Sequence, residues 1–383
     1  MLMTAGFDRQ QITVSEIDHA NLIFTQHGKP MTIGLDQVLR LDRQDISPTT
    51  SGSWQLRLVD GDRIFGQCGD LQNDSLKWTN PMLAELKFPI DQVQAMMRGA
   101  DVPGLGEVRK EDRIVLANHD QASGVVAGIS EGKVSIQANS QTTAIPLNNT
   151  DAVLFASVSA AQKPPTEAYR IVLRDQSRVT VHGLSLKTGR LIAQFPGSSE
   201  QRSVNFDDVL SIEHINGPVS WLSDRIPITS EQAAFASDLS YPAQMDRNVF
   251  GGPLRFEAET FTKGIGVHAN SKLTFALDGS YRIFRTRYAI DTNGDCGKAD
   301  VTVRVLLDGK PVHVQEHVKA YHLSPVLSVD LANCKTLTLE VTAGAATDTQ
   351  DRLDWLEAAL VREAPAGHRN DGLSPTTGTT SPS

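Results

Sequence analysis

The residues His313 and His317 have the spacing of a zinc-protease motif. They bracket a His-x-x-Glu-His pattern, which in such enzymes needs a helix that brings both histidines to one face. Here an Asp-Gly-Lys-Pro run at 308–311 precedes the pattern and valines alternate with polar residues, which predicts a hairpin strand. Two histidines four apart also share a face of a strand, but the sequence offers no third ligand, so we expect no catalytic zinc.

Carboxylates near the end of the last domain suggest a second chemistry. Asp348, Asp351 and Asp354 could supply the paired acids of glycoside hydrolysis. The sequence shows no second acidic cluster and no pattern of a catalytic barrel. We therefore expect a protein that is not an enzyme.

A third group has the alternating oxygen ligands of a calcium loop. Asp291, Asn293 and Asp295 stand at alternate positions, but the glycine register does not fit an EF-hand and no glutamate closes the loop. We keep a structural calcium ion as a weak hypothesis beside an ordinary polar turn. No other cofactor is expected.

These residues surround a glycine-rich stretch that organises the C-terminal third. Gly-Gly-Pro-Leu at 251–254 is followed by Lys-Gly-Ile-Gly-Val-His-Ala at 263–269. Since glycines reach positive φ without steric cost, the second run predicts a tight turn that holds His268 close to the main chain. Residues 254–261 predict an edge strand, and residues 273–277 predict a strand that alternates with period two.

Length and charge limit the function classes. The chain has 383 residues and a net charge of −9, so two to four domains are expected, and a surface for nucleic acid or anionic membrane is not. No run approaches the roughly 18 apolar residues of a membrane helix. Of the three cysteines, Cys296 and Cys334 are a candidate disulfide, the alternative being two buried free thiols.

Residues 10–215 contain an internal repeat of about 57 residues, marked by matching valines at 38, 93, 153 and 209. Each period holds four or five short alternating strands, which predicts tandem small β-barrels over 43–108, 109–162 and 163–216. Residues 1–42 match only the later strands, so we expect an incomplete first repeat and a natural start upstream of Met1. The run Leu56–Gly66 is similar to Sm-like and SH3-like barrels.

Residues 217–363 predict a different fold, a β-sandwich of the jelly-roll type. Several long alternating strands at regular spacing support this prediction. The segment 364–383 is polar, lacks periodicity and is expected to be disordered. The predicted fold class is therefore all-β: tandem small barrels followed by a sandwich.

The sandwich region resembles the NPCBM family of carbohydrate-binding modules, which also occur beside family 98 glycoside hydrolases. The resemblance is carried by Asp246–Val249, the two glycine runs, the Val303–Lys310 strand and turn, and Asp354-Trp355. It implies a jelly-roll sandwich that in some relatives binds galactose-type sugars. Because such modules commonly occur in extracytoplasmic proteins, it also implies that location, although residues 1–8 lack the features of a signal peptide.

Sugar binding requires a flat aromatic ring and a few fixed polar groups. Side chains of these types in or near the loops of the sandwich are the candidate sites: His268, Tyr288, Asp291, Tyr321, His322, Asp354 and Trp355, with Tyr241 and Arg287 beside them. Core packing is the competing role for Tyr288 and Trp355, and a structural hydrogen bond is the competing role for His268.

The predicted function is non-catalytic glycan binding by the sandwich, the glycan containing galactose. The repeats would serve as a spacer or as an arm that binds a protein partner. One alternative is a scaffold that keeps the sandwich but has lost sugar binding. A weaker one is an accessory part of a glycoside hydrolase system.

Overall fold

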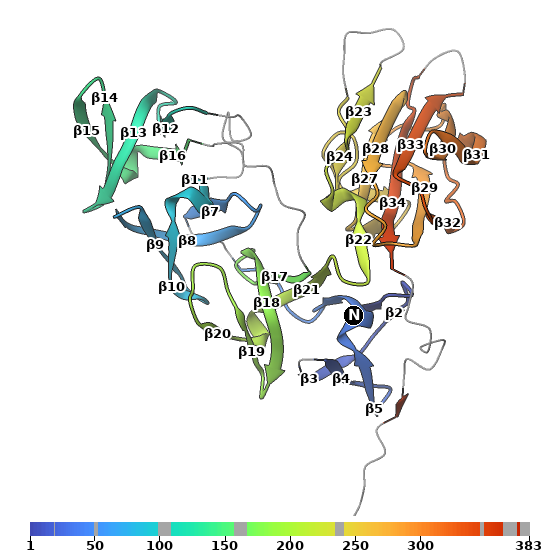
Figure 1. Ribbon diagram of the computed structural model, residues 1–383, viewed down its shortest axis with the longest axis horizontal. Helices are drawn as coiled ribbons and strands as arrows, with labels where there is room; N and C mark the ends of the chain where they lie inside the picture. The colour runs from blue at the N-terminus through green and yellow to red at the C-terminus, as the bar shows by residue number, and fades with distance from the viewer. Residues whose placement is uncertain are drawn as a thin grey trace, which may run out of the picture. The chain divides into compact units, whose positions relative to one another are not determined.

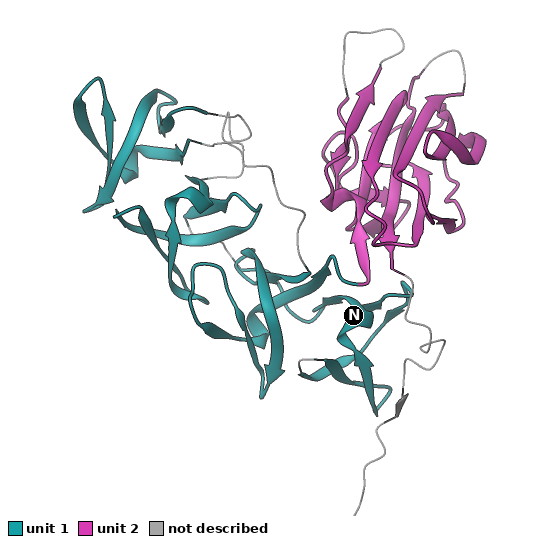
Figure 2. Ribbon diagram, viewed as in Figure 1, with its two compact units in different colours: residues 1–217, 371–383 teal, residues 218–370 magenta. Residues whose placement is uncertain are grey.

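The computed structural model describes residues 1–18, 20–49, 53–98, 109–156, 167–233, 241–344 and 348–362, together with the backbone of Ser374 and Pro375. The chain forms two compact units, unit 1 with residues 1–217 and 371–383 and unit 2 with residues 218–370 (Figure 2). The described residues contain only strands and short 3-10 turns, which confirms the all-β fold class. No helix in this part of the chain is long and apolar enough to cross a membrane.

Unit 1 contains four modules with a common plan (Figure 1). The second to fourth have five strands each and the first has six, because two short strands take the place of the long second strand; each module has a one-turn 3-10 helix before its last strand. The second module has β7 (Trp54–Leu58), β8 (Arg63–Gln72), β9 (Ser75–Asn80), β10 (Ala84–Pro89) and β11 (Val93–Met97). The third has β12 (Asp112–Leu116), β13 (Gln121–Ser130), β14 (Lys133–Ala138), β15 (Gln141–Pro146) and β16 (Thr150–Leu154). The fourth has β17 (Ala168–Leu173), β18 (Arg178–Lys187), β19 (Arg190–Gln194), β20 (Gln201–Asn205) and β21 (Val209–Ile215).

The first module is complete in its strands, which corrects the expectation of a missing opening strand. It has β1 (Leu2–Thr4), β2 (Arg9–Gln10), β3 (Thr13–Ile17), β4 (Asn21–Gln26), β5 (Lys29–Gly34) and β6 (Val38–Asp42). The short β1 pairs with β2 and β6, as β7 pairs with β8 and β11 in the second module. At three residues this strand is too short to show an alternating pattern, so the sequence did not reveal it.

The turn after the opening strand repeats in all four modules. The amides of Thr4, Leu58, Leu116 and Leu173 donate to the carbonyls four residues on, at 3.1, 2.9, 2.9 and 2.8 Å. In the last three modules an Asp or Asn side chain also closes the turn by accepting from the amide two residues later, in Asp60, Asn118 and Asp175. The repeat is therefore one of backbone geometry as well as of sequence.

The modules contact one another in the order third, second, fourth, first. The last strands β11 and β16 pair antiparallel, and so do the last strands β6 and β21, so two module pairs use the same joint. The second and fourth modules meet through their turns. There Asp62, which is 1% exposed, accepts hydrogen bonds from the amide and hydroxyl of Thr180 at 2.6 and 2.8 Å. In the reverse direction Asp175 accepts from the Asn80 amide group at 2.6 Å.

Unit 2 is a sandwich of two antiparallel sheets. One sheet has the order β24 (Gln244–Met245), β27 (Gly264–His268), β34 (Arg352–Val361), β29 (Ile283–Ile290) and β32 (Leu327–Asp330), with β22 (Val219–Trp221) also on β34. The other has the order β23 (Thr229–Gln232), β28 (Ser271–Ala276), β33 (Thr336–Ala343), β30 (Asp300–Leu307) and β31 (Lys310–Lys319). Alternate residues of both sheets fill the core, with Trp355, Phe275 and Phe284 among the largest buried side chains.

Two local predictions for unit 2 were wrong. Residues 264–268 form the strand β27 and not a turn, and residues 254–261 form a hairpin of β25 (Leu254–Phe256) and β26 (Glu259–Phe261). Gly266 is needed for close packing, since a Cβ there would lie 2.5 Å from the backbone of Asn248. Of the two alternatives for Cys296 and Cys334, the structure has free thiols in two separate loops, Cys296 buried and Cys334 partly exposed.

Candidate functional site

The segment between β24 and β25 forms a turn that displays an aromatic side chain. Asn248, which is 3% exposed, accepts through Oδ1 from the amides of Phe250 and Gly252 at 3.2 and 2.7 Å. Gly251 at the tip has φ +83°, a conformation that suits glycine. With its backbone fixed in this way, the Phe250 ring projects outward and is 59% exposed.

An aromatic cluster surrounds Phe250. The Tyr241 ring packs edge-on against Phe250 with centroids 5.7 Å apart, and its face stacks on His268 at 4.8 Å. His268 lies at the end of β27, where Nδ1 is 2.7 Å from the carbonyl of Ala269. His268 thus contacts the carbonyl of the next residue and does not hold a glycine-rich turn, and its ring belongs to the cluster.

Polar groups lie beside the cluster. The guanidinium carbon of Arg352 is 5.3 Å from the centre of the Phe250 ring, and Arg352 also donates to the Asp295 carbonyl. The Asp295 carboxylate accepts from the Gln350 amide at 2.6 Å. An exposed aromatic ring, a cation and a carboxylate–amide pair therefore share one surface, which we call the Phe250 surface: Tyr241, Phe250, His268, Asp295, Gln350 and Arg352.

Two buried carboxylates support this surface from below. Asp291 accepts from the Asn248 side chain at 3.0 Å, which ties the turn to the sheet. Asp354 lies on the central strand β34, opposite Gly266 and Ala289, and both acids are 1% exposed. Burial, and next the charge of Asp291, raise the pKa of Asp354 well above its usual range. The nearby backbone amide of Arg255 lowers the pKa of Asp354 and so opposes this rise. Its approach does not reach the geometry of a normal hydrogen bond, and no other described group donates one to either Asp354 oxygen.

An ion pair fixes the start of the same turn. Lys263, which is 4% exposed, contacts Asp224 at 2.9 Å and Asp246 at 3.1 Å. A buried charge of this kind needs its partners, because removal of one leaves the other uncompensated. Lys263 of the sequence motif is thus a structural residue.

The structure places the other predicted residues in different environments. Tyr288 and Trp355 are core residues, 5% and 0% exposed, that pack against each other, and burial raises the pKa of Tyr288. Tyr321 is 67% exposed and interacts with Cys296 and Asp295 at the margin of the Phe250 surface; the hydrogen bond to Cys296 raises its pKa. His322 is exposed, and Arg287 donates to the Ser324 carbonyl at 3.1 Å.

The metal hypotheses do not fit the geometry. His313 bonds Tyr288 at 2.9 Å, whereas His317, at φ +55°, faces Asp300 at 3.2 Å, so the two rings have separate partners. Asp291 uses both oxygens for hydrogen bonds, and Asn293 donates to it at 2.7 Å, which makes this loop a polar turn. Within the described ranges no group of three acidic, histidine or cysteine side chains could hold a metal ion.

The three acids considered for hydrolysis also diverge. Asp351 accepts from the Asp300 amide at 2.9 Å, and burial raises its pKa to about 6. Asp354 instead faces Asp291 beneath the turn, and Asp348 accepts from the Asp351 amide through its carbonyl. These carboxylates do not face a shared cleft.

Sequence reasoning missed Phe250, Arg352 and Gln350. The Asn-x-Phe-Gly-Gly run could have indicated Phe250, because an Asx turn followed by glycines often displays the residue between them. Gln350 and Arg352 lie before and at the start of β34, 100 and 102 residues after Phe250, and no local pattern links them to Phe250.

A comparison with protein-family models finds a match within unit 2. Residues 219–361 match the model of the NPCBM/NEW2 domain. No curated protein matches the chain. Among solved structures, the CBM51 domain of Clostridium perfringens GH95 in complex with methyl-galactose is 23% identical, with a TM-score of 0.34, and 37% of this chain covers 99% of it.

Two structures of the CBM51-2 and INT domains of Clostridium perfringens ZmpB, one with GlcNAc, are also similar, at 23% and 22% identity. Both have a TM-score of 0.35, and 48% of this chain covers 40% of each. At these values the similar structures assign no residue and no ligand to this chain. From its match to the family model, unit 2 contains an NPCBM/NEW2 domain, at residues 219–361.

Proposed function

We propose that unit 2 is a glycan-binding module and that the Phe250 surface is its binding site. The main observation behind this proposal is that Phe250 is 59% exposed on a turn whose backbone is fixed by the Asn248 side chain. A fixed and exposed aromatic ring offers the flat apolar face on which the C–H groups of a sugar ring can pack. The NPCBM/NEW2 match supports this class of ligand.

The polar part of the surface suits hydroxyl groups. Arg352, whose guanidinium lies over the Phe250 ring, supplies N–H donors, and Asp295 and Gln350, which bond each other, supply acceptors next to Arg352. Galactose has an axial hydroxyl on one side and a continuous apolar patch of C–H groups on the other, so it presents both features at once. A terminal galactose is therefore the ligand that we propose.

No catalytic step is part of this proposal. Asp291 and Asp354 are 1% exposed beneath the turn and cannot reach a bound sugar. The modules of unit 1 would then act as a spacer or as an arm for a protein partner, and the extracytoplasmic location of other carbohydrate-binding proteins would suit this role.

A glycan array probed with the full chain, with and without calcium, tests the proposal. We expect a galactose-terminated hit whose affinity does not depend on calcium and falls at least about tenfold in Phe250→Ala, a loss of about 1.4 kcal/mol. Val326→Ala, which removes another exposed apolar side chain of unit 2, is the matched control and should bind normally. An array without a hit from the folded chain would favour the scaffold alternative.

A further inference from the structure

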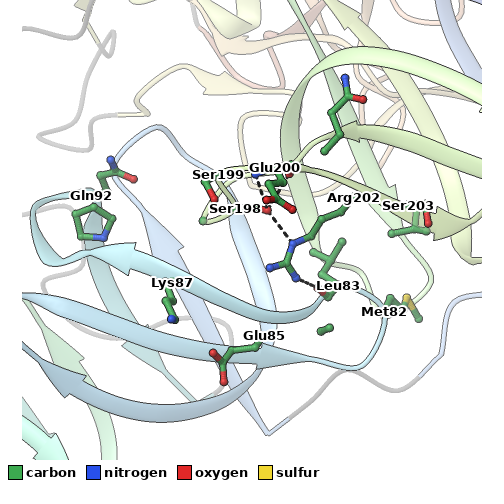
Figure 3. Close-up of a pocket in the computed structure, with 15 residues that line it drawn as sticks. Met82, Leu83, Glu85, Lys87, Gln92, Ser198, Ser199, Glu200, Arg202 and Ser203 are labelled. Atoms are coloured by element: carbon green, nitrogen blue, oxygen red, sulfur yellow. Dashed lines mark hydrogen bonds between the residues drawn. The ribbon is translucent and has the colours of Figure 1, made fainter.

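A groove in unit 1 lies between the second and fourth modules. Its volume is about 930 Å³, and its walls are β10 with the preceding turn on one side and β20 with the 197–200 loop on the other (Figure 3). Arg202 spans the groove and donates to the Leu83 carbonyl at 2.8 Å and to the Ser198 hydroxyl at 2.8 Å. Two parts of the chain more than 100 residues apart therefore form one binding surface.

Both walls are edge strands. β20 pairs with β19 along one side, and the bond from the Phe206 amide to the Gly189 carbonyl fixes the register. In an antiparallel pair with this register, the amides of Gln201, Ser203 and Asn205 point away from β19. These outward amides have no partner strand in the described part of the chain, and such an edge is a template for another strand.

The same position is already used in two other modules. Counting back from the 3-10 turn, Ser203 corresponds to Thr32, Lys87 and Ala144 in the first, second and third modules. Thr32 pairs with Ser374, and the Lys87 amide donates to the Gly197 carbonyl at 3.0 Å. The edge of the strand before the 3-10 turn thus takes up another backbone segment in the first and second modules, whereas β15 and β20 have no such partner among the described residues, and of these two β20 lines the groove.

The chemistry of the groove favours a neutral strand. Its charged lining residues are Glu85, Lys87, Glu200 and Arg202, two of each sign. The segment 371–383 fits this balance, since it has no charge after Asp371, and Thr376–Ser381 has six residues without proline. Threonine favours extended backbone. Five residues of β20 span about 17 Å, which such a run can match.

We propose that β20 binds residues 376–381 of a second copy of the chain by strand addition within this groove. We assign the segment to a second copy because Ser374 and Pro375 of the same chain already pair with β5. Two such exchanges between two chains would give a closed dimer through the modules. This use of unit 1 is independent of glycan binding by unit 2.

Photo-crosslinking of the full chain tests this proposal. Benzoylphenylalanine replaces Thr377, light and heavy isotope copies are mixed, and the crosslinked peptides are mapped by mass spectrometry. We expect light–heavy crosslinks to residues 201–205 or 84–87. Crosslinks confined to residues 29–34 of the same copy, or no crosslinks, would overturn the proposal.

A matched pair of variants distinguishes loss of the binding edge of β20 from a general loss of folding. Ser203→Pro removes one outward amide, a change that an edge strand tolerates, and should reduce the crosslink yield at least fivefold. Ala144→Pro makes the same change on β15 and should leave the yield unchanged. An equal yield in both variants would also contradict the proposal, and the wild-type mapping stands even if Ser203→Pro fails to fold.

Discussion

Two turns of the molecule, residues 58–62 in unit 1 and residues 248–252 in unit 2, have different structural roles. Each is closed by a side-chain oxygen. In unit 1 the turn directs Asp62 into the joint between two modules, where the carboxylate is 1% exposed. In unit 2 the buried side chain is Asn248, and the turn directs Phe250 outward to 59% exposure.

The difference shows that the same kind of turn can either join two modules or hold a side chain out in solvent. A repeated module can gain stability by burying a turn against its neighbour, as the second and fourth modules do, because each small sheet covers little apolar surface alone. A sandwich has enough core to hold its loops from within, so a loop side chain can stay in solvent. Recognition of a ligand is then expected in the loops of unit 2 and at the strand edges of unit 1.

The largest expected effect comes from removing the internal support of the turn in unit 2. Asn248→Ala deletes two bonds to the turn amides and leaves Oδ2 of buried Asp291 without its donor, although Asn293 still donates to Oδ1. We expect unit 2 to lose about 3–5 kcal/mol of stability, since two turn bonds are lost and one oxygen of a buried carboxylate loses its hydrogen bond. Thermal unfolding followed by near-ultraviolet circular dichroism measures this loss.

Asn293→Ala is the control for that variant. It removes the side-chain bonds from an exposed loop to the other Asp291 oxygen and to the Pro253 carbonyl, while the backbone amide of residue 293 still donates to Asp291, so the change should cost about 1 kcal/mol. If the two variants lose the same free energy of unfolding, the buried contacts of Asn248 do not hold the turn in place as described.

A smaller effect is expected at the joint of unit 1, and it depends on pH. Burial, followed by the charge of Asp60, raises the pKa of Asp62 to about 6 from 3.8. Between these values the folded state binds more protons than the unfolded state, so stability falls as pH rises from about 4 to above 6. A shift of about two units corresponds to at most about 3 kcal/mol.

Hydrogen exchange at the Thr180 amide, corrected for its intrinsic rate, reports this joint directly because that amide donates to Asp62. Protection should fall over this pH range in the wild type and stay level in Asp62→Asn. Asp120→Asn alters the corresponding, exposed turn of the third module and should keep the wild-type slope. Protection that rises with pH would contradict the assigned pKa direction.

The smallest effect is expected at the margin of the Phe250 surface. Tyr321 is 67% exposed, so Tyr321→Ala should change stability by less than about 0.5 kcal/mol. If the sugar lies on Phe250, the affinity of Tyr321→Ala should fall no more than about threefold, as measured by titration calorimetry. A loss as large as that of Phe250→Ala would move the centre of the site toward Asp295 and Tyr321.

The sequence predicts the elements of this protein better than its site. Alternating strands and the spaced valines indicate the repeats and the sandwich because each pattern lies within one element. The glycines of β27 were read as a turn because glycine permits both a turn and a close approach, and only the packing of Gly266 on Asn248 distinguishes them. Phe250 and Arg352 meet through tertiary structure, so spacing along the chain could not pair them.

The central claim is that a sugar ring packs on Phe250. The most direct measurement is fluorine NMR of the full chain labelled with 4-fluorophenylalanine at its 13 phenylalanines, with the Phe250 signal assigned from Phe250→Leu. On titration with the galactose-terminated ligand from the array, we predict a saturable shift of the Phe250 signal while that of buried Phe275 stays fixed. Saturable binding that leaves the Phe250 signal unchanged would contradict the account.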